Sequence, residues 1–293
     1  MAASPPTRSP STEGLLLVDK PAGMTSHDVV AIARRALGER RIGHAGTLDP
    51  FATGLLVLLA GRMTRLLPYL DGEPKVYEAR IQFGAETDTD DATGRTVREA
   101  PAPIRADVDR AISALTGAID QEPPAYSAKQ VGGRRAYDAA RSGVPVRLPP
   151  SRVTVHSWEI TRRTNDALDA VITCSGGTYV RALARDLGRQ AASAAHLATL
   201  RRTRSGPFHV SDACGLDALR DGRCTPLPPL RALTSLAVEH LDAAGADRVA
   251  RGNLVDATVA GARAALVGPN GELVAVAVRS GENWQPRTVF RDA

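Results

Sequence analysis

The apolar positions of the chain fall into short continuous runs, alternating stretches and a few stretches with helical spacing. Runs and alternations of this length are typical of strands, which we predict at Gly14–Asp19, Leu55–Ala60, Lys75–Phe83, Val153–Arg163, Leu168–Cys174 and Ala198–Arg204. Helical spacing predicts helices at 27–37, Thr64–Leu70, Arg105–Leu115, Arg134–Arg141 and Thr178–Gly188. The first helix is expected to have Ser26 as its N-cap and to end at Gly38. Because strands and helices do not alternate regularly, the pattern favours an α+β fold.

The length of 293 residues exceeds that of most single cores, which predicts one large domain and a smaller one. The first residues, Met1–Thr12, are rich in Pro, Ser and Ala and are expected to form a disordered tail. A Pro-rich stretch places a linker at residues 225–237. The main domain then covers residues 13–224. Residues 238–293 are expected to form a small β-rich module with two or three short strands and a final strand at Arg287–Phe290.

No apolar run reaches the roughly 18–20 residues that a bilayer crossing requires, and the N-terminus lacks the apolar core of a signal peptide. Both observations indicate a cytoplasmic protein that does not contact a membrane. The cysteines Cys174, Cys214 and Cys224 form no C-x-x-C pair and have no histidine at zinc-finger spacing. We therefore expect neither a disulfide framework nor a zinc site, and interpret the cysteines as small apolar residues in a reducing compartment.

The chain carries 37 basic and 32 acidic residues, a formal net charge of +5, and its pI is about 9.4. An excess of positive charge suits a polyanionic partner such as nucleic acid. Only three of the basic residues are lysines, and arginine binds phosphates and base edges through its planar fork. The surplus of arginine could also result from compositional drift in an Ala-rich chain. Charge alone therefore does not distinguish a nucleic-acid partner from such drift.

The densest motif of the sequence is the segment Gly43–Gly54, GHAGTLDPFATG. Its glycines let the backbone turn sharply or approach a ligand closely. Asp49 precedes Pro50, which favours an extended backbone at the aspartate. In the alternative interpretation, Asp49 merely caps a helical turn that starts with Pro50. That alternative does not account for the Gly-His-Ala-Gly sequence ahead of it.

The same segment resembles the signature of the bacterial tRNA pseudouridine-55 synthases, the TruB family. Five further blocks agree with that family in order and spacing, namely Lys20–Ser26 (KPAGMTS), Lys75–Tyr77 (KVY), Pro123–Lys129 (PPAYSAK), Gly177–Arg181 (GTYVR) and Leu200–Phe208 (LRRTRSGPF). The resemblance covers residues 14–213. It departs from the family at Ala128–Gln130, where a further apolar residue is expected before the lysine.

The resemblance implies the fold of pseudouridine synthases, a mixed, mainly antiparallel central sheet with flanking helices, followed by a PUA-like C-terminal module. It also implies the isomerisation of uridine to pseudouridine at position 55 in the T-arm loop of tRNA, after the base leaves its stack. The reaction oxidises nothing and imports no group, so we expect no cofactor and no metal. The resemblance assigns the catalytic carboxylate to Asp49 and the cation that keeps it ionised to Arg181. It places Tyr77 under the uracil, with its hydroxyl ready to take the C5 proton.

The remaining residues that we assign to substrate binding are His44, Tyr179, Leu200, Lys20 and Lys129. By resemblance, Leu200 closes the pocket from above, Tyr179 lines it, and His44 occupies the space in the RNA that the flipped nucleotide leaves. Residues 124–152 resemble the insertion with which stand-alone enzymes hold the T stem-loop of tRNA. We therefore expect a monomer that needs no guide RNA.

Alternatives stay open for several of these residues. Arg181 on a helix is ordinarily a solvated surface residue, Tyr77 on a strand ordinarily packs in the core, and a lone loop histidine such as His44 is ordinarily incidental. The atom that Asp49 attacks does not follow from the sequence. For the whole protein, the alternatives are a guide-RNA-dependent relative of the family and a non-catalytic tRNA-binding or RNA-chaperone protein.

The acidic stretch Gly84–Arg95 is expected to form a loop because it is rich in turn residues. Its aspartates are reminiscent of a calcium site. An EF-hand loop that starts at Asp88 would need an oxygen ligand at its fifth position and glycine at its sixth. The chain has Ala92 and Thr93 there, which excludes this motif.

Overall fold

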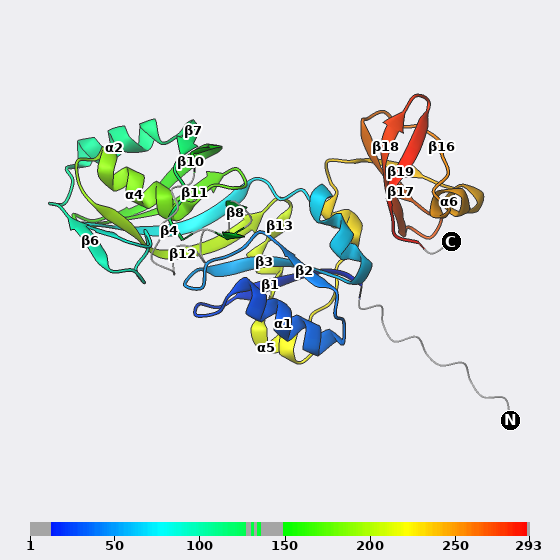
Figure 1. The fold of residues 1–293 in the computed structure, drawn as a ribbon, viewed down its shortest axis with the longest axis horizontal. Coiled ribbons are helices and arrows are strands. Elements are labelled where there is room, and N and C mark those ends of the chain that lie inside the picture. The colour runs from blue at the N-terminus through cyan, green and yellow to red at the C-terminus, as the bar shows by residue number, and fades with distance from the viewer. Residues whose placement is uncertain (1–12, 127–129, 132–133, 136–148, 292–293) are drawn as a thin grey trace.

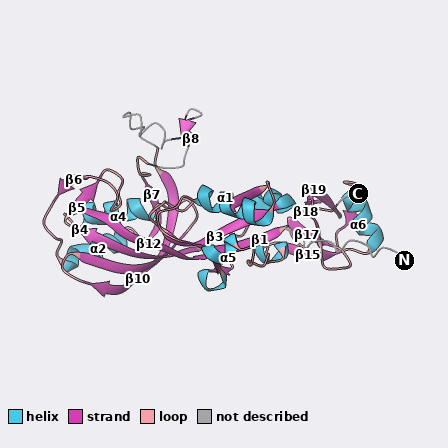
Figure 2. Ribbon diagram, turned by 90° about the horizontal axis from the view of Figure 1, so that it is seen from below, coloured by secondary structure: helices cyan, strands magenta, loops and turns pink. Residues whose placement is uncertain are grey.

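The computed structural model describes residues 13–126, 130–131, 134–135 and 149–291 of the chain. Within these ranges a large sheet with flanking helices is followed by a smaller C-terminal sheet, which lies at one end of the elongated molecule in both views (Figures 1 and 2). Strands and helices do not alternate regularly, so the predicted α+β class is confirmed. The tail predicted at residues 1–12 lies outside the described residues.

The large sheet is mixed and mainly antiparallel. Its strands follow the spatial order β14 (Cys214–Gly215), β1 (Gly14–Lys20), β3 (Thr53–Ala60), β12 (Ala195–Ser205), β4 (Lys75–Phe83), β11 (Ala167–Cys174), β10 (Ser151–Arg163) and β7 (Gly117–Gln121). In addition, β2 (Ile42–Ala45) pairs with β3, and β13 (Phe208–His209) pairs with β12. Among the described pairings of this sheet, those of β1 with β14 and of β3 with β12 are parallel. The strand arrangement expected from the resemblance is therefore present.

The described part of the chain also contains helices and two small hairpins. They are α1 (Ser26–Leu37), η1 (Gly61–Tyr69), α2 (Arg105–Ala114), α4 (Val180–Gln190), η2 (Val210–Asp212), α5 (Leu216–Arg220), η3 (Pro229–Ala232) and α6 (Ala243–Ala250), with the hairpins β5 (Ala85–Thr87) to β6 (Thr96–Glu99) and β8 (Gln130–Val131) to β9 (Arg134–Arg135). None of these described helices combines the length and the apolar character that crossing a membrane would take.

The continuous apolar run of β1 is buried on both faces of the large sheet, which explains why it does not alternate. Leu16 and Val18 lie in the larger core, together with residues of α1, α2, α4 and α5. Leu15 and Leu17 lie in a second core on the opposite face, together with residues of η1, η3 and the C-terminal sheet. The C-terminal sheet is therefore packed against the large one by shared apolar contacts.

Helix α1 begins with a capping box that the sequence analysis placed one residue too late. Thr25 is the N-cap: its Oγ1 accepts a hydrogen bond from Asp28 N at 3.1 Å, and Asp28 Oδ2 accepts one from Thr25 N at 2.8 Å. The helix ends at Gly38, in the left-handed region with φ 63°. Ser26 does not cap the helix, because its hydroxyl binds the backbone of Leu48 instead.

Three other local predictions differ from the structure. The helix predicted at Thr64–Leu70 is a 3₁₀ helix that contains Pro68, which lacks the N–H that an α-helix interior requires. The loop predicted at Gly84–Arg95 contains strand β5. The basic helix predicted at Arg134–Arg141 is wrong at Arg134–Arg135, which form strand β9, and its remainder lies outside the described residues.

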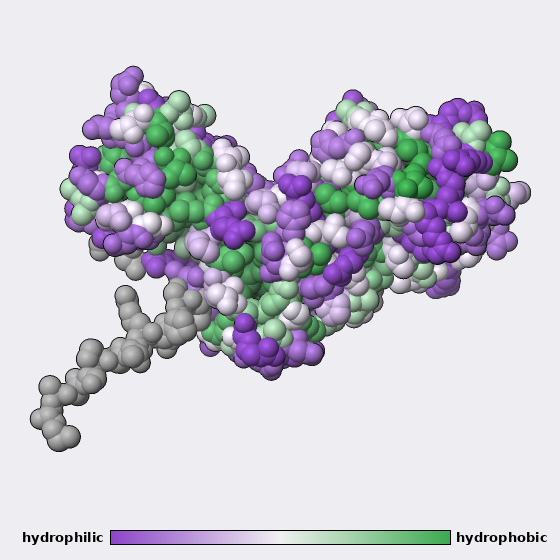
Figure 3. All heavy atoms as spheres, turned by 180° about the vertical axis from the view of Figure 1, so that it is seen from behind, coloured by the Kyte–Doolittle hydropathy of each residue, from purple (hydrophilic) through white to green (hydrophobic). Residues whose placement is uncertain are grey.

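The C-terminal sheet has the order β15 (Ala237–His240), β17 (Arg263–Val267), β18 (Leu273–Ser280), β19 (Asn283–Val289) and β16 (Val255–Asp256). Our estimate of two or three short strands was too low and omitted helix α6. Trp284 is fully buried in this core, and its Nε1 donates to Glu239 Oε2 at 2.8 Å. The stretch predicted as a linker pairs with β1, because Leu227 exchanges two backbone hydrogen bonds with Leu15. Seen from behind, a notch separates the C-terminal sheet from the far end of the large sheet (Figure 3).

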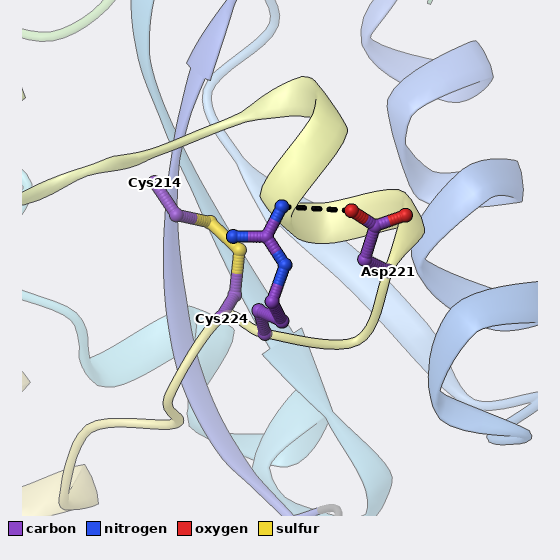
Figure 4. Close-up of a disulfide and its surroundings, with 4 residues drawn as sticks. Cys214, Asp221 and Cys224 are labelled. Carbon is purple, nitrogen blue, oxygen red and sulfur yellow. Dashed lines mark hydrogen bonds and ion pairs between the residues drawn. A yellow bond between two sulfur atoms is a disulfide. The ribbon is translucent and has the colours of Figure 1, made fainter.

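Cys214 and Cys224 form a disulfide, so our interpretation of all the cysteines as small apolar residues was wrong (Figure 4). The bond joins β14 to the segment that follows α5, with a Cα–Cα distance of 5.9 Å that suits a bridge. Their sequence separation of 10 matches no redox or zinc motif, so spacing gave no indication of the pair. Cys174 is a free buried thiol, and burial raises its pKa to about 11.

The disulfide is expected to stabilise the folded chain. Closing a loop of this size restricts the unfolded state and contributes about 2–3 kcal/mol. We therefore expect Cys224→Ala to lower the free energy of unfolding by that amount in urea denaturation, with a matching loss when the wild type is reduced. As a control, alkylation in denaturant without a reductant should label Cys174 alone. Labelling of Cys214 and Cys224 under that condition would contradict the bridge.

Candidate active site

A pocket of about 260 Å³ opens at the centre of the large sheet. Its walls come from the segment before β3, from β4, from the start of α4 and from β12. The lining residues are Gly46, Thr47, Leu48, Asp49, Lys75, Tyr77, Gly177, Thr178, Tyr179, Val180, Arg181 and Leu200. Segments far apart in the sequence therefore meet at one cavity, and five of the predicted site residues line it.

Asp49 and Arg181 form a bidentate ion pair in this pocket. Arg181 Nε donates to Asp49 Oδ2 at 2.9 Å, and Arg181 Nη2 donates to Asp49 Oδ1 at 3.0 Å. The arginine side chain is 5% exposed and the aspartate side chain 33% exposed. The carboxylate is therefore the more accessible partner of the pair, and both residues line the cavity. Such a fork fixes the orientation of the carboxylate as well as its charge.

Arg181 is held by further acceptors, so it is not the solvated surface residue of the alternative interpretation. Its Nη1 donates to Thr89 O at 2.9 Å and its Nη2 to Tyr126 O at 2.9 Å. Asp91 Oδ2 lies 3.7 Å from Nη1 and adds a second negative charge. A buried arginine requires this degree of pairing. The acidic stretch that we predicted as a plain loop thus supplies two of the partners of Arg181, Thr89 and Asp91.

A second buried ion pair lies beside the first and was missed by the sequence analysis. Arg185, one turn after Arg181 on α4, donates to Asp90 Oδ2 at 2.9 Å and to Glu122 O at 2.8 Å. Burial raises the pKa of Asp90 to about 6, although Arg185 opposes that shift. The i, i+4 spacing of the two arginines was the available signal, because it places them on one face of a helix.

The segment that carries Asp49 is fixed by β1 and α1. Lys20 Nζ donates to Met24 O at 2.7 Å and to Pro50 O at 3.3 Å. Leu48 N donates to Ser26 Oγ at 2.9 Å. Lys20 is fully buried, and burial lowers its pKa to about 8. Lys20 was predicted to contact substrate. In the structure it does not line the pocket, and its ammonium group binds backbone carbonyls that precede α1 and follow Asp49.

No helix begins at Pro50, so the capping alternative for Asp49 is wrong. The chain bends at Pro50 and Phe51 and enters β3 at Thr53. Gly54, with φ 102°, allows this entry because a Cβ there would lie 2.2 Å from Arg202 O. The glycine is therefore required by the close approach of β12.

Tyr77 and Leu200 lie on adjacent strands, β4 and β12, and are 6% and 7% exposed. Burial raises the pKa of the Tyr77 hydroxyl, and the nearby guanidinium of Arg202 partly offsets the shift. Tyr179 lies at the start of α4, where its backbone N–H donates to Gln121 Oε1 at 2.8 Å. All three residues border the cavity, and their contacts with a uracil stay predictions.

The structure does not bring every predicted residue into the pocket. His44 lies on β2 and does not line the cavity; its ring packs edge-on against His27 with centroids 5.4 Å apart. Its Nδ1 is buried without a hydrogen-bond partner among the described residues, and burial lowers its pKa. Lys129 lies outside the described residues. Within the part of the chain that the structure covers, no group of acidic, histidine or cysteine side chains is arranged to hold a metal ion.

Solved structures with the same fold include a chain of a Cbf5-Nop10-Gar1 complex, with a TM-score of 0.71 at 22% identity over 96% of this chain and 86% of that one. A chain of an H/ACA RNP bound to a substrate RNA containing 2′-deoxyuridine gives a TM-score of 0.70 at 20% identity, with the same coverage of 96% and 86%. At this level of identity, the likeness shows the fold alone.

Sequence comparisons are more specific. Residues 34–180 match the model described as TruB family pseudouridylate synthase (N terminal domain), and residues 181–225 match the tRNA pseudouridylate synthase B C-terminal domain. The chain is 45% identical to tRNA pseudouridine synthase B of Thermobifida fusca over 95% of its own length and 98% of the relative. The corresponding protein of Nocardia farcinica is 44% identical, with 99% and 97% covered. The chain therefore belongs to the TruB family of pseudouridylate synthases and is an isomerase.

Proposed function

We propose that the chain converts uridine to pseudouridine at position 55, in the T-arm loop of tRNA. Relatives that are 44% and 45% identical over nearly the whole chain are named tRNA pseudouridine synthase B, which supports tRNA as the substrate. The observation that carries the proposal is the carboxylate of Asp49, held bidentately by Arg181 and facing a cavity that Tyr77 also lines.

In the proposed reaction, the residues that line the pocket have separate tasks. The target nucleotide leaves its stack, because the cavity is enclosed by side chains and does not admit a duplex. Isomerisation breaks the N1–C1′ bond, turns the uracil and joins C5 to C1′. Asp49 acts as the carboxylate at the sugar or the base, and the fixed charge of Arg181 favours its ionised form. Tyr77 and Leu200 hold the uracil between them.

We also propose roles for the segments outside the pocket. Residues 124–152 hold the T stem-loop, Lys129 contributes to that contact, and His44 occupies the space left by the flipped nucleotide. Residues 238–293 act as a PUA-like RNA-binding module after the linker at residues 225–237. The chain acts as a monomer without a guide RNA, in contrast to the guide-RNA-dependent alternative.

The proposed function is tested with the purified chain alone and a tRNA transcript that carries tritium at C5 of its uridines. Each pseudouridine formed releases one C5 hydrogen to water. We expect one equivalent of tritium per tRNA, and none from a transcript with cytidine at position 55. Release only after addition of a guide RNA would favour the guide-dependent alternative. Tight binding without any release would favour a non-catalytic RNA-binding protein.

A variant of Tyr77 separates its two proposed tasks. Tyr77→Phe keeps the ring face under the uracil and removes the hydroxyl that takes the C5 proton. We expect RNA affinity to stay within a few-fold of wild type, while single-turnover conversion of uridine falls by about 10²-fold or more. With 5-fluorouridine at the target there is no C5 proton, so the loss in consumption of the nucleotide should be much smaller. Equal losses on both substrates would refute the proton role.

A further inference from the structure

Two cationic groups meet at the side of the pocket formed by Gly46. A Cβ atom on Gly46 would lie 3.0 Å from Lys75 Nζ and 3.4 Å from Arg202 Nη1, so both groups border the same small space. Lys75 lines the pocket itself, two residues before Tyr77 on β4. Because side chains alternate along a strand, Lys75 and Tyr77 point to the same face of the sheet.

Neither nitrogen makes a hydrogen bond or a close ion pair in the described part of the chain. Lys75 Nζ makes no hydrogen bond or ion pair there, and Arg202 Nη1 is buried without a hydrogen-bond partner. The carboxylate of Glu73, which precedes β4, accepts a hydrogen bond from Gly176 N at 2.8 Å instead. Arg181, across the same pocket, is by contrast paired with two aspartates.

Arg202 is held in place by its other nitrogens. Its Nε donates to Leu55 O at 2.8 Å and its Nη2 to Gly46 O at 3.0 Å, so the guanidinium bridges both ends of the segment that carries Asp49. The side chain is 0% exposed. Burial, with the charge of Arg202 added, lowers the pKa of Lys75. Glu73 and Cys174 oppose this shift, but burial and the like charge of Arg202 outweigh them. This part of the pocket therefore favours the entry of negative charge.

We propose that Lys75 is a further catalytic residue, whose ammonium group stabilises the negative charge that the uracil acquires when its N1–C1′ bond breaks. This inference rests on the proposed function. The electron pair of the broken bond moves onto the uracil, where N1 and the carbonyl oxygens carry it. C1′ meanwhile forms a bond to a carboxylate oxygen of Asp49, or the ribose loses a proton. When C5 attacks C1′, the pair enters the new bond while the carboxylate of Asp49 leaves C1′, or while the ribose takes back its proton. The C5 proton then leaves. Lys75 donates a hydrogen bond to the charged carbonyl oxygen of the uracil and transfers no proton.

The position of the two cations favours a charge on the base over a charge on the RNA backbone. Arg202 is fully enclosed and does not reach the outer surface, where phosphates remain solvated. Lys75 shares the pocket wall with Tyr77, the residue expected beneath the uracil. A donor aimed at a developing anion in an enclosed site is worth far more than one in water.

The test compares Lys75→Met with wild type in single-turnover conversion of a T-arm RNA that carries uridine or 5-fluorouridine at the target. We expect a loss of about 10²–10³-fold on uridine, as for removal of one donor to a developing anion, with affinity nearly unchanged. Fluorine withdraws electron density and stabilises the uracil anion by itself. The loss on 5-fluorouridine should therefore be smaller by about tenfold or more, and Lys75→Arg should restore part of the rate on uridine.

Arg80→Met is the matched control, because it removes another cation from β4. Arg80 pairs with Asp169 at 3.1 Å and does not line this pocket. It should leave the rate nearly normal on both substrates. Thermal unfolding of each variant checks the fold, and Lys75→Gln replaces the methionine variant if that one is unstable. A normal rate with weakened affinity in the Lys75 variant would assign the lysine to a backbone phosphate and overturn the inference. Equal losses of rate on uridine and 5-fluorouridine in the Lys75 variant would also overturn the inference. A wild-type chain without activity would instead refute the proposed function.

Discussion

Replacement of Asp49 by asparagine is expected to lower the single-turnover rate of pseudouridine formation by roughly 10⁴-fold or more, a barrier increase of about 5 kcal/mol. Asparagine has nearly the shape of aspartate, so the neighbouring segment, held by Lys20 and Ser26, should keep its course. It lacks the negative charge and the second acceptor oxygen that Arg181 binds in the wild type. The affinity for tRNA should stay within a few-fold, because phosphate contacts dominate RNA binding.

The control for this variant is Asp169→Asn, the same chemical change at an acid that pairs with Arg80 on the large sheet. That variant should convert tRNA at nearly the wild-type rate. If Asp49→Asn unfolds, or retains about a hundredth of the rate, a barrier change of only about 3 kcal/mol, then Asp49 is structural and the proposed chemistry is wrong.

The second large effect is expected for Arg181→Lys, although the formal charge is conserved. Arginine presents a planar fork that binds Asp49 through two nitrogens and still reaches Thr89 O and Tyr126 O. A lysine offers one ammonium group and leaves several of these acceptors without a donor. In a site where the side chain is 5% exposed, its pKa would also fall through desolvation. We expect a rate loss of about 10²-fold or more, about 3 kcal/mol in the barrier, with little change in affinity.

Arg189→Lys serves as the comparison, because Arg189 lies on the same helix but its side chain is 49% exposed where it pairs with Glu86. Glu86 is buried, but neither residue of this pair lines the pocket and lysine keeps the positive charge, so the rate should be nearly normal. Single-turnover kinetics at saturating enzyme separate the rate from the affinity. A normal rate for Arg181→Lys, with only a modest loss of affinity, would remove Arg181 from the active site.

The strands that form the pocket were predictable because their burial leaves a pattern in the sequence. The run at Gly14–Asp19 is apolar at consecutive positions since both faces of β1 are covered. Lys75–Phe83 alternates because Tyr77, Ala79 and Ile81 face the core while the intervening residues are more exposed. The pairing of Asp49 with Arg181 joins residues 132 positions apart. No periodicity indicates such a contact, and only the family resemblance placed the two residues together.

The burial of several charged residues could not be predicted from the sequence. Asp90 and Asp91 belong to a stretch rich in turn residues, which is ordinarily solvated, yet both are buried against arginines of α4. Arg202 belongs to a basic strand and is fully buried, because the backbone carbonyls of two other segments accept its hydrogen bonds. The partners of such residues come from distant parts of the chain, so local pattern cannot identify them. The same holds for the bridge between Cys214 and Cys224.

The most direct measurement is a crystal structure of the chain bound to a T-arm hairpin with 5-fluorouridine at position 55. We expect this nucleotide to be flipped out of the RNA, with its base between Tyr77 and Leu200 and its sugar next to the carboxylate of Asp49. Lys75 Nζ should lie within hydrogen-bond distance of a carbonyl oxygen of the base. A complex in which the fluorinated base stays stacked in the loop, or occupies another surface while this pocket holds no nucleotide, would contradict it.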